Sequence, residues 1–351
     1  MKTVLNKTKL KNQKQTVLNF LSVSSALAVA GCGGGQVVPE NTSTENLNGE
    51  NFFGSAIADI IRGTDLNDSI YSSSGDDRIF AQGGNDLIYS QNGYDVVYAG
   101  SGDDTIYISD FDELIDGGTG YDTIILEPSL GFQAISVNFE TGELSESNLQ
   151  TANAISISNI ERIISNLSSD ILLTGIDAVD SITTLSGNDT IFTGSQTSVI
   201  ATGGGTDVVT LNGNGHTVSL GKGDDTLTFS DFFNSANGGD ETDTLFFKTQ
   251  DIDGQITVNL SENSIKFNGL HKSSVTSFES VIIEGPTAIE LIGSSQNEHL
   301  AGGSGNDLIK GNGGTDRVSG GGGNDTFIMS ENAFLTIDDF EFGLGGDVLG
   351  N

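Results

Sequence analysis

Apolar side chains recur at every ninth position along much of the chain. In the first stretch they are Ile70, Ile79, Ile88, Val97 and Ile106, and an aspartate stands two residues before each of them. A glycine precedes most of these aspartates by two residues, which gives the unit Gly-x-Asp-x-apolar, with glycine at position 4, aspartate at 6 and the apolar residue at 8. Residues around position 8 are β-branched or aromatic and favour a short strand, whereas the others are rich in Gly, Asn and Asp and favour a turn. The pattern predicts a series of strand–turn units.

The same unit returns in two later stretches, and two similar connectors separate the three stretches. Alternating apolar residues at 135–139 and 256–260, and again at 159–164 and 277–282, predict strands within these connectors. The later position-8 residues are Ile182, Ile191, Ile200, Val209, Val218, Leu227 and Leu245, followed by Leu300, Ile309, Val318 and Phe327.

Two nine-residue units are expected to close one flat coil of strand, turn, strand and turn. When such coils stack, each strand pairs in parallel with the strand below it, and the apolar side chains form a continuous core. The sequence therefore predicts an all-β fold, a parallel β-roll or β-solenoid built from nonapeptide repeats. We expect three tandem modules at 59–134, 171–250 and 289–351, joined by short β connectors at 135–170 and 251–288.

Stacked turns bring the position-6 carboxylates to within one strand spacing of each other, roughly 4.8 Å. Calcium suits this arrangement because it takes about 6–8 hard oxygen ligands from carboxylates and main-chain carbonyls. Zinc does not, because the chain has one cysteine and three histidines, which are scattered. The repeats therefore predict Ca²⁺ as the cofactor.

The predicted metal ligands are Asp68 and the turns that keep both the glycine and the aspartate. Turns with Ser198, His216 or Glu298 at position 6 are expected to bind calcium weakly or not at all. The complete turns are Gly75 with Asp77, Gly84 with Asp86, Gly93 with Asp95, Gly102 with Asp104, Gly120 with Asp122, Gly187 with Asp189, Gly205 with Asp207, Gly223 with Asp225, Gly305 with Asp307, Gly314 with Asp316, and Gly323 with Asp325.

The composition supports a chain whose folding depends on a cation. Among its 351 residues, Asp and Glu outnumber Lys and Arg by 48 to 14, for a net charge of −34. Such charge opposes compaction, yet 35% of the residues are hydrophobic and periodically placed, so bound divalent cations reconcile the two observations. Nucleic acid is excluded as a partner, because basic residues cluster only in the first fourteen positions.

The first residues have the pattern of an export signal. A lysine-rich start is followed by an apolar stretch too short for a good membrane span, so residues 1–31 are predicted to be a signal peptide. Val29-Ala30-Gly31-Cys32 resembles the lipobox of bacterial lipoproteins, which implies lipid attachment at Cys32 and a place at the cell surface, as an outer-membrane lipoprotein, or outside the cell. An unmodified cysteine near an ordinary cleavage site is the alternative. Residues 32–58 are expected to be a flexible tether.

Three runs, 99–107, 302–310 and 320–328, resemble the haemolysin-type, or RTX, calcium-binding repeat. The resemblance implies a parallel β-roll with calcium bound between turns i and i+2. It also implies a secreted protein, in which folding would be coupled to calcium outside the cell.

Function is expected to be structural or adhesive rather than enzymatic. No His-Glu-x-x-His or Gly-x-Ser-x-Gly motif occurs in the sequence. The alternative is the non-catalytic repeat portion of an RTX exoenzyme or toxin exported by type I secretion. Tyr71, Tyr89 and Tyr107 are expected to stack on one outer face of the solenoid. This face could bind a glycan or protein partner, or the three rings could simply pack against one another.

Overall fold

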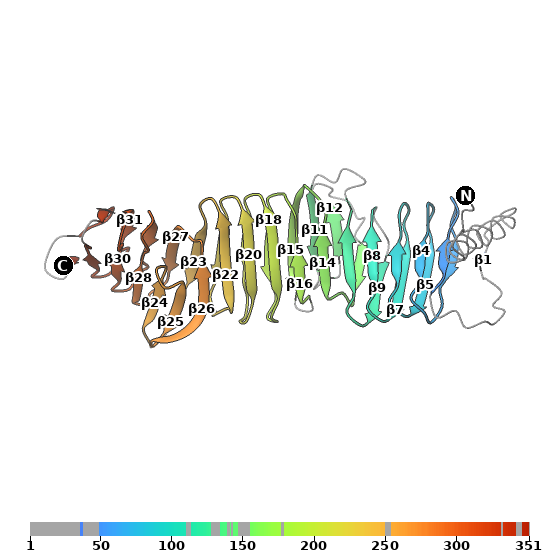
Figure 1. The fold of residues 1–351 in the computed structure, drawn as a ribbon, viewed down its shortest axis with the longest axis horizontal. Coiled ribbons are helices and arrows are strands. Elements are labelled where there is room, and N and C mark those ends of the chain that lie inside the picture. The colour runs from blue at the N-terminus through green and yellow to red at the C-terminus, as the bar shows by residue number, and fades with distance from the viewer. Residues whose placement is uncertain are drawn as a thin grey trace, which may run out of the picture.

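The chain winds into an elongated solenoid whose strands lie across its long axis (Figure 1). The structure is a computed structural model that describes residues 36–37, 49–109, 114–127, 134–138, 141, 143–146, 155–176, 179–249, 254–330, 333–341 and 346–350. Throughout these ranges the regular elements are strands, and no helix occurs that is long and apolar enough to cross a membrane. The all-β prediction is confirmed.

One face of the solenoid is a sheet of 17 strands, here called sheet A, counted over the described residues. In spatial order its strands are β1 (Gln36–Val37), β3 (Ile60–Arg62), β5 (Arg78–Gly83), β7 (Val96–Ser101), β9 (Leu114–Thr119), β13 (Ile155–Ser158), β12 (Glu143–Glu146), β11 (Ala134–Asn138), β15 (Asp170–Ile176), β17 (Thr190–Thr193), β19 (Val208–Thr210), β21 (Thr226–Phe229), β23 (Thr244–Lys248), β27 (Ser280–Glu284), β29 (His299–Ala301), β31 (Thr315–Ser319) and β33 (Phe334–Ile337).

The opposite face is sheet B, which also contains 17 strands in the part of the chain described. In spatial order these are β2 (Asn51–Phe53), β4 (Ser69–Tyr71), β6 (Leu87–Tyr89), β8 (Thr105–Ile108), β10 (Thr123–Leu126), β14 (Arg162–Ser165), β16 (Ser181–Thr183), β18 (Val199–Gly204), β20 (Thr217–Lys222), β22 (Ser235–Asp240), β26 (Leu270–Thr276), β25 (Ser264–Phe267), β24 (Ile256–Asn259), β28 (Ile289–Ile292), β30 (Leu308–Lys310), β32 (Thr326–Ile328) and β34 (Val348–Gly350).

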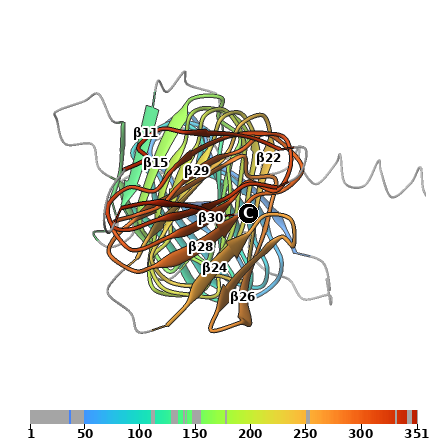
Figure 2. The same ribbon diagram turned by 90° about the vertical axis from the view of Figure 1, so that its left-hand side faces the viewer.

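Parallel pairing joins residues that are 18 positions apart, as the repeat predicts. Ile70 pairs with Ile88 in sheet B, and Ile79 pairs with Val97 in sheet A. Seen along the long axis, the coils overlie one another (Figure 2). All position-8 side chains predicted to be buried are at most 3% exposed and belong to one core between the sheets. Each isoleucine buried in this way contributes about 1.5–3 kcal/mol.

The two connectors are strands, as predicted, but each folds back on itself within one sheet. In the first, β11, β12 and β13 form an antiparallel meander, with β13 beside β9 and β11 beside β15. In the second, β24, β25 and β26 repeat this topology between β28 and β22. Parallel pairing continues past both meanders in the other sheet, through β10 to β14 and through β23 to β27.

The first meander lies in sheet A and the second lies in sheet B, although their sequences are similar. Each repeat carries the chain to the opposite sheet. Ten strands, β14 to β23, lie between the two connectors, so the chain crosses an odd number of times from β13 to β24. Strand pairing is continuous through both connectors in both sheets. The boundaries of the three modules stay predictions.

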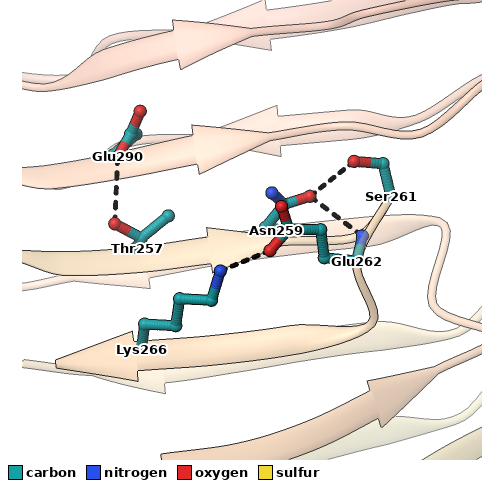
Figure 3. A network of polar contacts seen from close by, with 6 residues as sticks. All are labelled: Thr257, Asn259, Ser261, Glu262, Lys266 and Glu290. Atoms are coloured by element: carbon teal, nitrogen blue, oxygen red, sulfur yellow. Dashed lines mark hydrogen bonds and ion pairs between the residues drawn. The ribbon is translucent and has the colours of Figure 1, made fainter. Parts of the chain in front are cut away.

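Polar contacts hold the second meander together (Figure 3). The side-chain oxygen of Asn259 accepts hydrogen bonds from the Ser261 hydroxyl at 2.7 Å and the Glu262 N–H at 3.1 Å, which closes the turn between β24 and β25. Lys266 and Glu262 form an ion pair across that turn. The Thr257 hydroxyl donates to Glu290 on β28 at 2.9 Å, which ties the meander to the next coil.

Aromatic side chains form a ladder on the outer side of sheet B. The ring centroids of Tyr71 and Tyr89 are 4.8 Å apart, and those of Tyr89 and Tyr107 are 4.4 Å apart, with the rings nearly parallel. This confirms the predicted stacking. Because the ring faces cover each other, the ladder presents ring edges and hydroxyl groups outward.

Candidate metal centre

The position-6 side chains line up at the turns in two columns that run along the solenoid. Column A contains those that precede strands of sheet A, and column B contains those that precede strands of sheet B. All twelve predicted aspartate ligands lie in these columns and are at most 2% exposed. The acidic members of column A are Asp59, Asp77, Asp95, Asp189, Asp207, Asp225, Asp243, Glu279, Glu298 and Asp316, and those of column B are Asp68, Asp86, Asp104, Asp122, Glu161, Asp180, Asp307, Asp325 and Asp347.

One oxygen of each aspartate is held by the main chain of the coil before it. The Asp86 N–H donates to Asp104 Oδ1 at 2.7 Å, and the Asp207 N–H donates to Asp225 Oδ1 at 2.7 Å. The same bond joins every consecutive pair of predicted aspartates, over 18 residues. The repeat therefore orients each carboxylate before any ligand binds.

The second oxygen of many of these carboxylates is buried and has no hydrogen-bond donor. Asp86, Asp104, Asp122, Asp225 and Asp243 all have such an oxygen, with no partner among the described residues. A buried carboxylate oxygen without a partner is costly, because it has lost its water and gained nothing in return. These oxygens are therefore the atoms to which a cation would bind.

Threonine hydroxyls lie near two further carboxylates but are engaged elsewhere. The Thr184 hydroxyl donates to the Thr202 carbonyl at 2.8 Å, and the Thr202 hydroxyl donates to the Leu220 carbonyl at 2.6 Å. Since a hydroxyl has one hydrogen, neither donates to the adjacent Asp189 or Asp207, whose second oxygens are also without a donor.

Burial and mutual repulsion disfavour the ionised form of these carboxylates in the absence of a cation. The pKa of Asp86 is raised to about 8 and that of Asp104 to about 7, mainly by burial and in part by neighbouring carboxylates, against the lowering effect of main-chain hydrogen bonds. Burial likewise raises the pKa of Asp122 to about 6 and that of Asp243 to about 7. A bound cation would reverse this penalty by favouring the ionised form.

Position-1 glycines leave room beside the free carboxylate oxygens. A Cβ atom added to Gly302 would lie 2.3 Å from the second oxygen of Asp307 and 2.5 Å from the Gly320 carbonyl oxygen. At Gly320 the added atom would lie 2.1 Å from the second oxygen of Asp325. Each position-1 glycine thus opens a cradle bordered by a carboxylate oxygen and, in the first case, a main-chain carbonyl.

Position-4 glycines are required for a different reason. Gly102 has φ of +122°, and a Cβ atom there would lie 2.1 Å from the carbonyl oxygen of Gly84 in the coil below. Any other residue would be strained and would also collide with the backbone. The Gly-x-Asp spacing is thus a condition for stacking as well as for binding.

The chemistry of the donors fits calcium. Hard oxygen atoms from carboxylates and carbonyls border the cradles, and calcium takes about 6–8 of these. Within the described ranges, no three His, Cys, Asp or Glu side chains come close enough to hold a metal by themselves. Main-chain carbonyls must therefore complete each site, as the glycine cradles allow.

Two of the three turns that depart from the motif satisfy their own polar groups. The His216 Nδ1 atom accepts the Ser198 N–H at 3.1 Å, and its Nε2 atom lies 3.0 Å from the Asn212 carbonyl oxygen, so that network places the ring hydrogen on Nε2. The Ser198 hydroxyl donates to the Val179 carbonyl at 2.9 Å. These polar groups are therefore paired without a cation, and weak or absent calcium binding at these two positions stays a prediction.

The third departure, Glu298, continues the acidic column. Its N–H donates to Asp316 Oδ1 at 3.0 Å, and one of its carboxylate oxygens is buried without a donor. Glu298 differs from the aspartates in that its other oxygen accepts the Ser294 N–H of its own turn at 3.2 Å and not an N–H of the coil before it. Weak binding at this turn stays a prediction.

Besides Glu298, six acidic residues of the columns were not among the predicted ligands. Glu161 and Glu279 occupy position 6 within the connectors, where the turn has been shortened. Asp347 follows Gly345 with the full motif spacing. The other three, Asp59, Asp180 and Asp243, have Ile57, Ala178 and Glu241 where the motif has glycine. Their sequence signal is an acid two residues before a buried apolar residue.

Comparison with known protein families agrees with this geometry. The family model of the RTX calcium-binding nonapeptide repeat matches four segments, residues 53–88, 82–107, 174–215 and 292–327. A search among curated proteins finds no match to the chain. Repeats of this family are generally structural rather than catalytic, and the proteins that carry them are typically secreted or extracellular. The chain is therefore a β-solenoid in which four segments match the RTX calcium-binding nonapeptide repeat, and repeats of this kind bind calcium.

Proposed function

We propose that calcium binding along columns A and B drives folding of this chain outside the cell, where it serves a structural or adhesive role. The observation that carries this proposal is the set of buried carboxylate oxygens without donors, such as those of Asp104 and Asp225. In calcium-poor surroundings these groups repel each other, which opposes folding. Millimolar calcium would neutralise them and stabilise the folded chain in proportion to the number of ions bound.

Circular dichroism of the full chain during a calcium titration, after treatment with a chelator, tests this function. The β signal is expected to rise cooperatively with calcium and to be restored much less by the same concentration of magnesium, which keeps its water and demands octahedral geometry. A β signal already complete in the chelator would contradict coupled folding. Binding measured by calorimetry on the same sample separates absence of coupling from absence of binding.

Export and anchoring are the second part of the proposal. Residues 1–31 and Cys32 lie outside the described residues, so this part is supported by the basic and apolar order of the leader and by the Val29–Cys32 sequence. Metabolic labelling with a fatty acid is expected to mark the wild-type chain and not the Cys32→Ser variant. Equal labelling of the two chains, or none in either, would contradict lipid attachment at this residue.

A further inference from the structure

We propose that Glu161 and Glu279, with main-chain carbonyls of the meanders, complete two calcium sites at Asp122 and Asp243, where the meanders interrupt the repeats. The inference rests on calcium binding by the columns, as proposed above. Neither glutamate belongs to a Gly-x-Asp turn, and neither lies in a segment that matches the repeat family. Both sites nevertheless have the features of the regular cradles.

In both places a glutamate takes the position of the next aspartate in the column. The Asp122 N–H donates to Glu161 Oε2 at 2.8 Å, and the Asp243 N–H donates to Glu279 Oε2 at 3.0 Å. These bonds span 39 and 36 residues, because a meander lies between the partners, whereas the regular bond spans 18. The columns therefore continue across the connectors.

The glutamates follow from the shape of the connector turn. In the regular coil, four residues (118–121) stand between Gly117 and the acid at 122. Asn159 stacks next to Gly117, but only Ile160 stands between it and the acid Glu161. Ser277, Phe278 and Glu279 repeat this short turn above Gly238. A glutamate has one more methylene group than aspartate, which lets its carboxylate reach the column from the shortened turn.

The aspartate at each site has a buried oxygen with nothing to bind. Asp122 and Asp243 are both 0% exposed, and the second carboxylate oxygen of each has no hydrogen-bond donor among the described residues. The first oxygens accept the N–H groups of Asp104 and Asp225, so both carboxylates are held in place. An oriented, desolvated oxygen of this kind is an independent sign of a missing cation.

A main-chain carbonyl shares the cradle with that oxygen. A Cβ atom added to Gly117 would lie 2.7 Å from the second oxygen of Asp122 and 2.1 Å from the Asn159 carbonyl oxygen. At Gly238 the corresponding distances are 2.5 Å to Asp243 and 1.9 Å to the Ser277 carbonyl oxygen. In the regular cradle at Gly302, the two neighbours are likewise a carboxylate oxygen and a carbonyl oxygen. The connector cradles thus keep the same donor types, with the carbonyl supplied by the meander.

Counting bound calcium in glutamate variants of the full chain tests the inference. The variants are Glu161→Gln, Glu279→Gln and the double variant, and Glu284→Gln is the matched control because this exposed acid lies on the same strand as the second site but outside both columns. Glutamine keeps an oxygen that can accept the main-chain N–H, so the turn can still close. Bound calcium is measured by equilibrium dialysis and elemental analysis, and affinities by calorimetry.

Each single variant is expected to lose about one ion per chain, the double variant about two, and the control none. If wild type binds calcium and the double variant binds as many ions with the same affinities, the connector sites do not exist. If wild type binds no calcium, the proposed function itself fails.

Asp243→Asn serves as a second variant should Glu279→Gln fail to fold. It keeps the side-chain volume and removes the charge at the buried oxygen, so it should also lose one ion. Retention of every ion by a folded Asp243→Asn chain would overturn the second site.

Discussion

The coils between Gly187 and Asp243 have two kinds of turn, one on each side of the same stack. In column A, Asp207 and Asp225 each leave a buried oxygen without a donor. In column B, the same coils have Ser198 and His216, whose polar groups bind each other and nearby carbonyls. The backbone path is similar on both sides. The buried polar groups of such a turn can therefore be satisfied either by a cation or by the protein's own donors, and the position-6 side chain decides which.

His216 shows how the second solution works. Its Nδ1 atom accepts a main-chain N–H, as an aspartate oxygen would, and its Nε2–H points to a carbonyl oxygen. Burial lowers its pKa, so the ring is held neutral. The imidazole thus supplies both an acceptor and a donor. The calcium dependence of this part of the solenoid should therefore be confined to column A.

The largest difference between the columns is expected from adding one methyl group to a turn glycine. In Gly223→Ala of column A, the new Cβ atom would lie 1.7 Å from the Gly205 carbonyl oxygen, at φ of +121°. In Gly215→Ala of column B, it would lie 2.7 Å from the Thr197 hydroxyl, which can rotate away, at φ of +83°. Chemical denaturation in saturating calcium should show a loss of more than about 3 kcal/mol for the first and about 1–2 kcal/mol for the second. Equal losses would show that column A turns are no tighter than those of column B.

Acidification should replace calcium in part, because protons can neutralise the columns. The pKa of Asp86 is raised to about 8, and the pKa values of Asp104 and Asp243 to about 7, from the ordinary 3.8. A raised folded-state pKa gives stability that is full below the unfolded pKa and is lost as pH rises through the folded value. The chelated chain should therefore be more stable at pH 5 than at pH 8.

His216 acts in the opposite direction, because its lowered pKa makes its contribution decline as pH falls through the ordinary value of 6.5. The carboxylates outnumber it, so the net effect keeps their sign. Denaturation of the chelated chain at pH 5, 6.5 and 8 checks this, and a fall in stability toward pH 5 would show that the histidine turn dominates. The calcium-loaded chain serves as the comparison, since its carboxylates must be ionised to bind.

Removing one charge from column A should weaken stabilisation by calcium without changing the metal-free chain much. Asp225→Asn keeps an oxygen for the Asp207 N–H but loses the charge at the buried oxygen. At calcium 100 times above the dissociation constant, the loss of one site is expected to cost about 2.7 kcal/mol. His216→Gln is the matched column B variant, and its effect should be the same with calcium and with chelator. Thermal unfolding in both conditions separates the two, and a calcium-dependent effect at His216 would refute the comparison.

The smallest effect is expected from converting the histidine turn toward the acidic kind. In His216→Asp, the new carboxylate could accept the Ser198 N–H, but its second oxygen would be buried without a donor, and the Asn212 carbonyl would lose the Nε2–H that it now accepts. The variant should lose about 1–3 kcal/mol in chelator and recover part of this in calcium. Unfolding curves with and without calcium measure the recovery. No recovery would show that the surroundings of position 216 cannot hold an ion.

The nine-residue period was enough to predict most of the fold and where most of the acidic side chains line up. Position 8 is buried in every predicted repeat because alternation along a strand and an 18-residue coil leave no other place for it, as for Ile88 and Val209. The predicted aspartates lie in the columns for the same reason. The motif missed Glu161 and Glu279 because it describes a regular turn, and these residues lie in turns shortened next to a meander.

By itself, the sequence determined the coil length, the parallel register, the buried core and the identity of the ion, because each depends on residue types at a local, repeated spacing. Only the tertiary structure decided which acids stand together across a connector, since Asp243 meets Glu279 after an insertion that returns to its starting coil. It also decided that the two meanders lie in opposite sheets, which depends on whether an odd or even number of coil halves separates them. The closed network at His216 depends likewise on a partner one full coil away. Contacts between coils follow from stacking, and stacking is a property of the whole solenoid rather than of any single repeat.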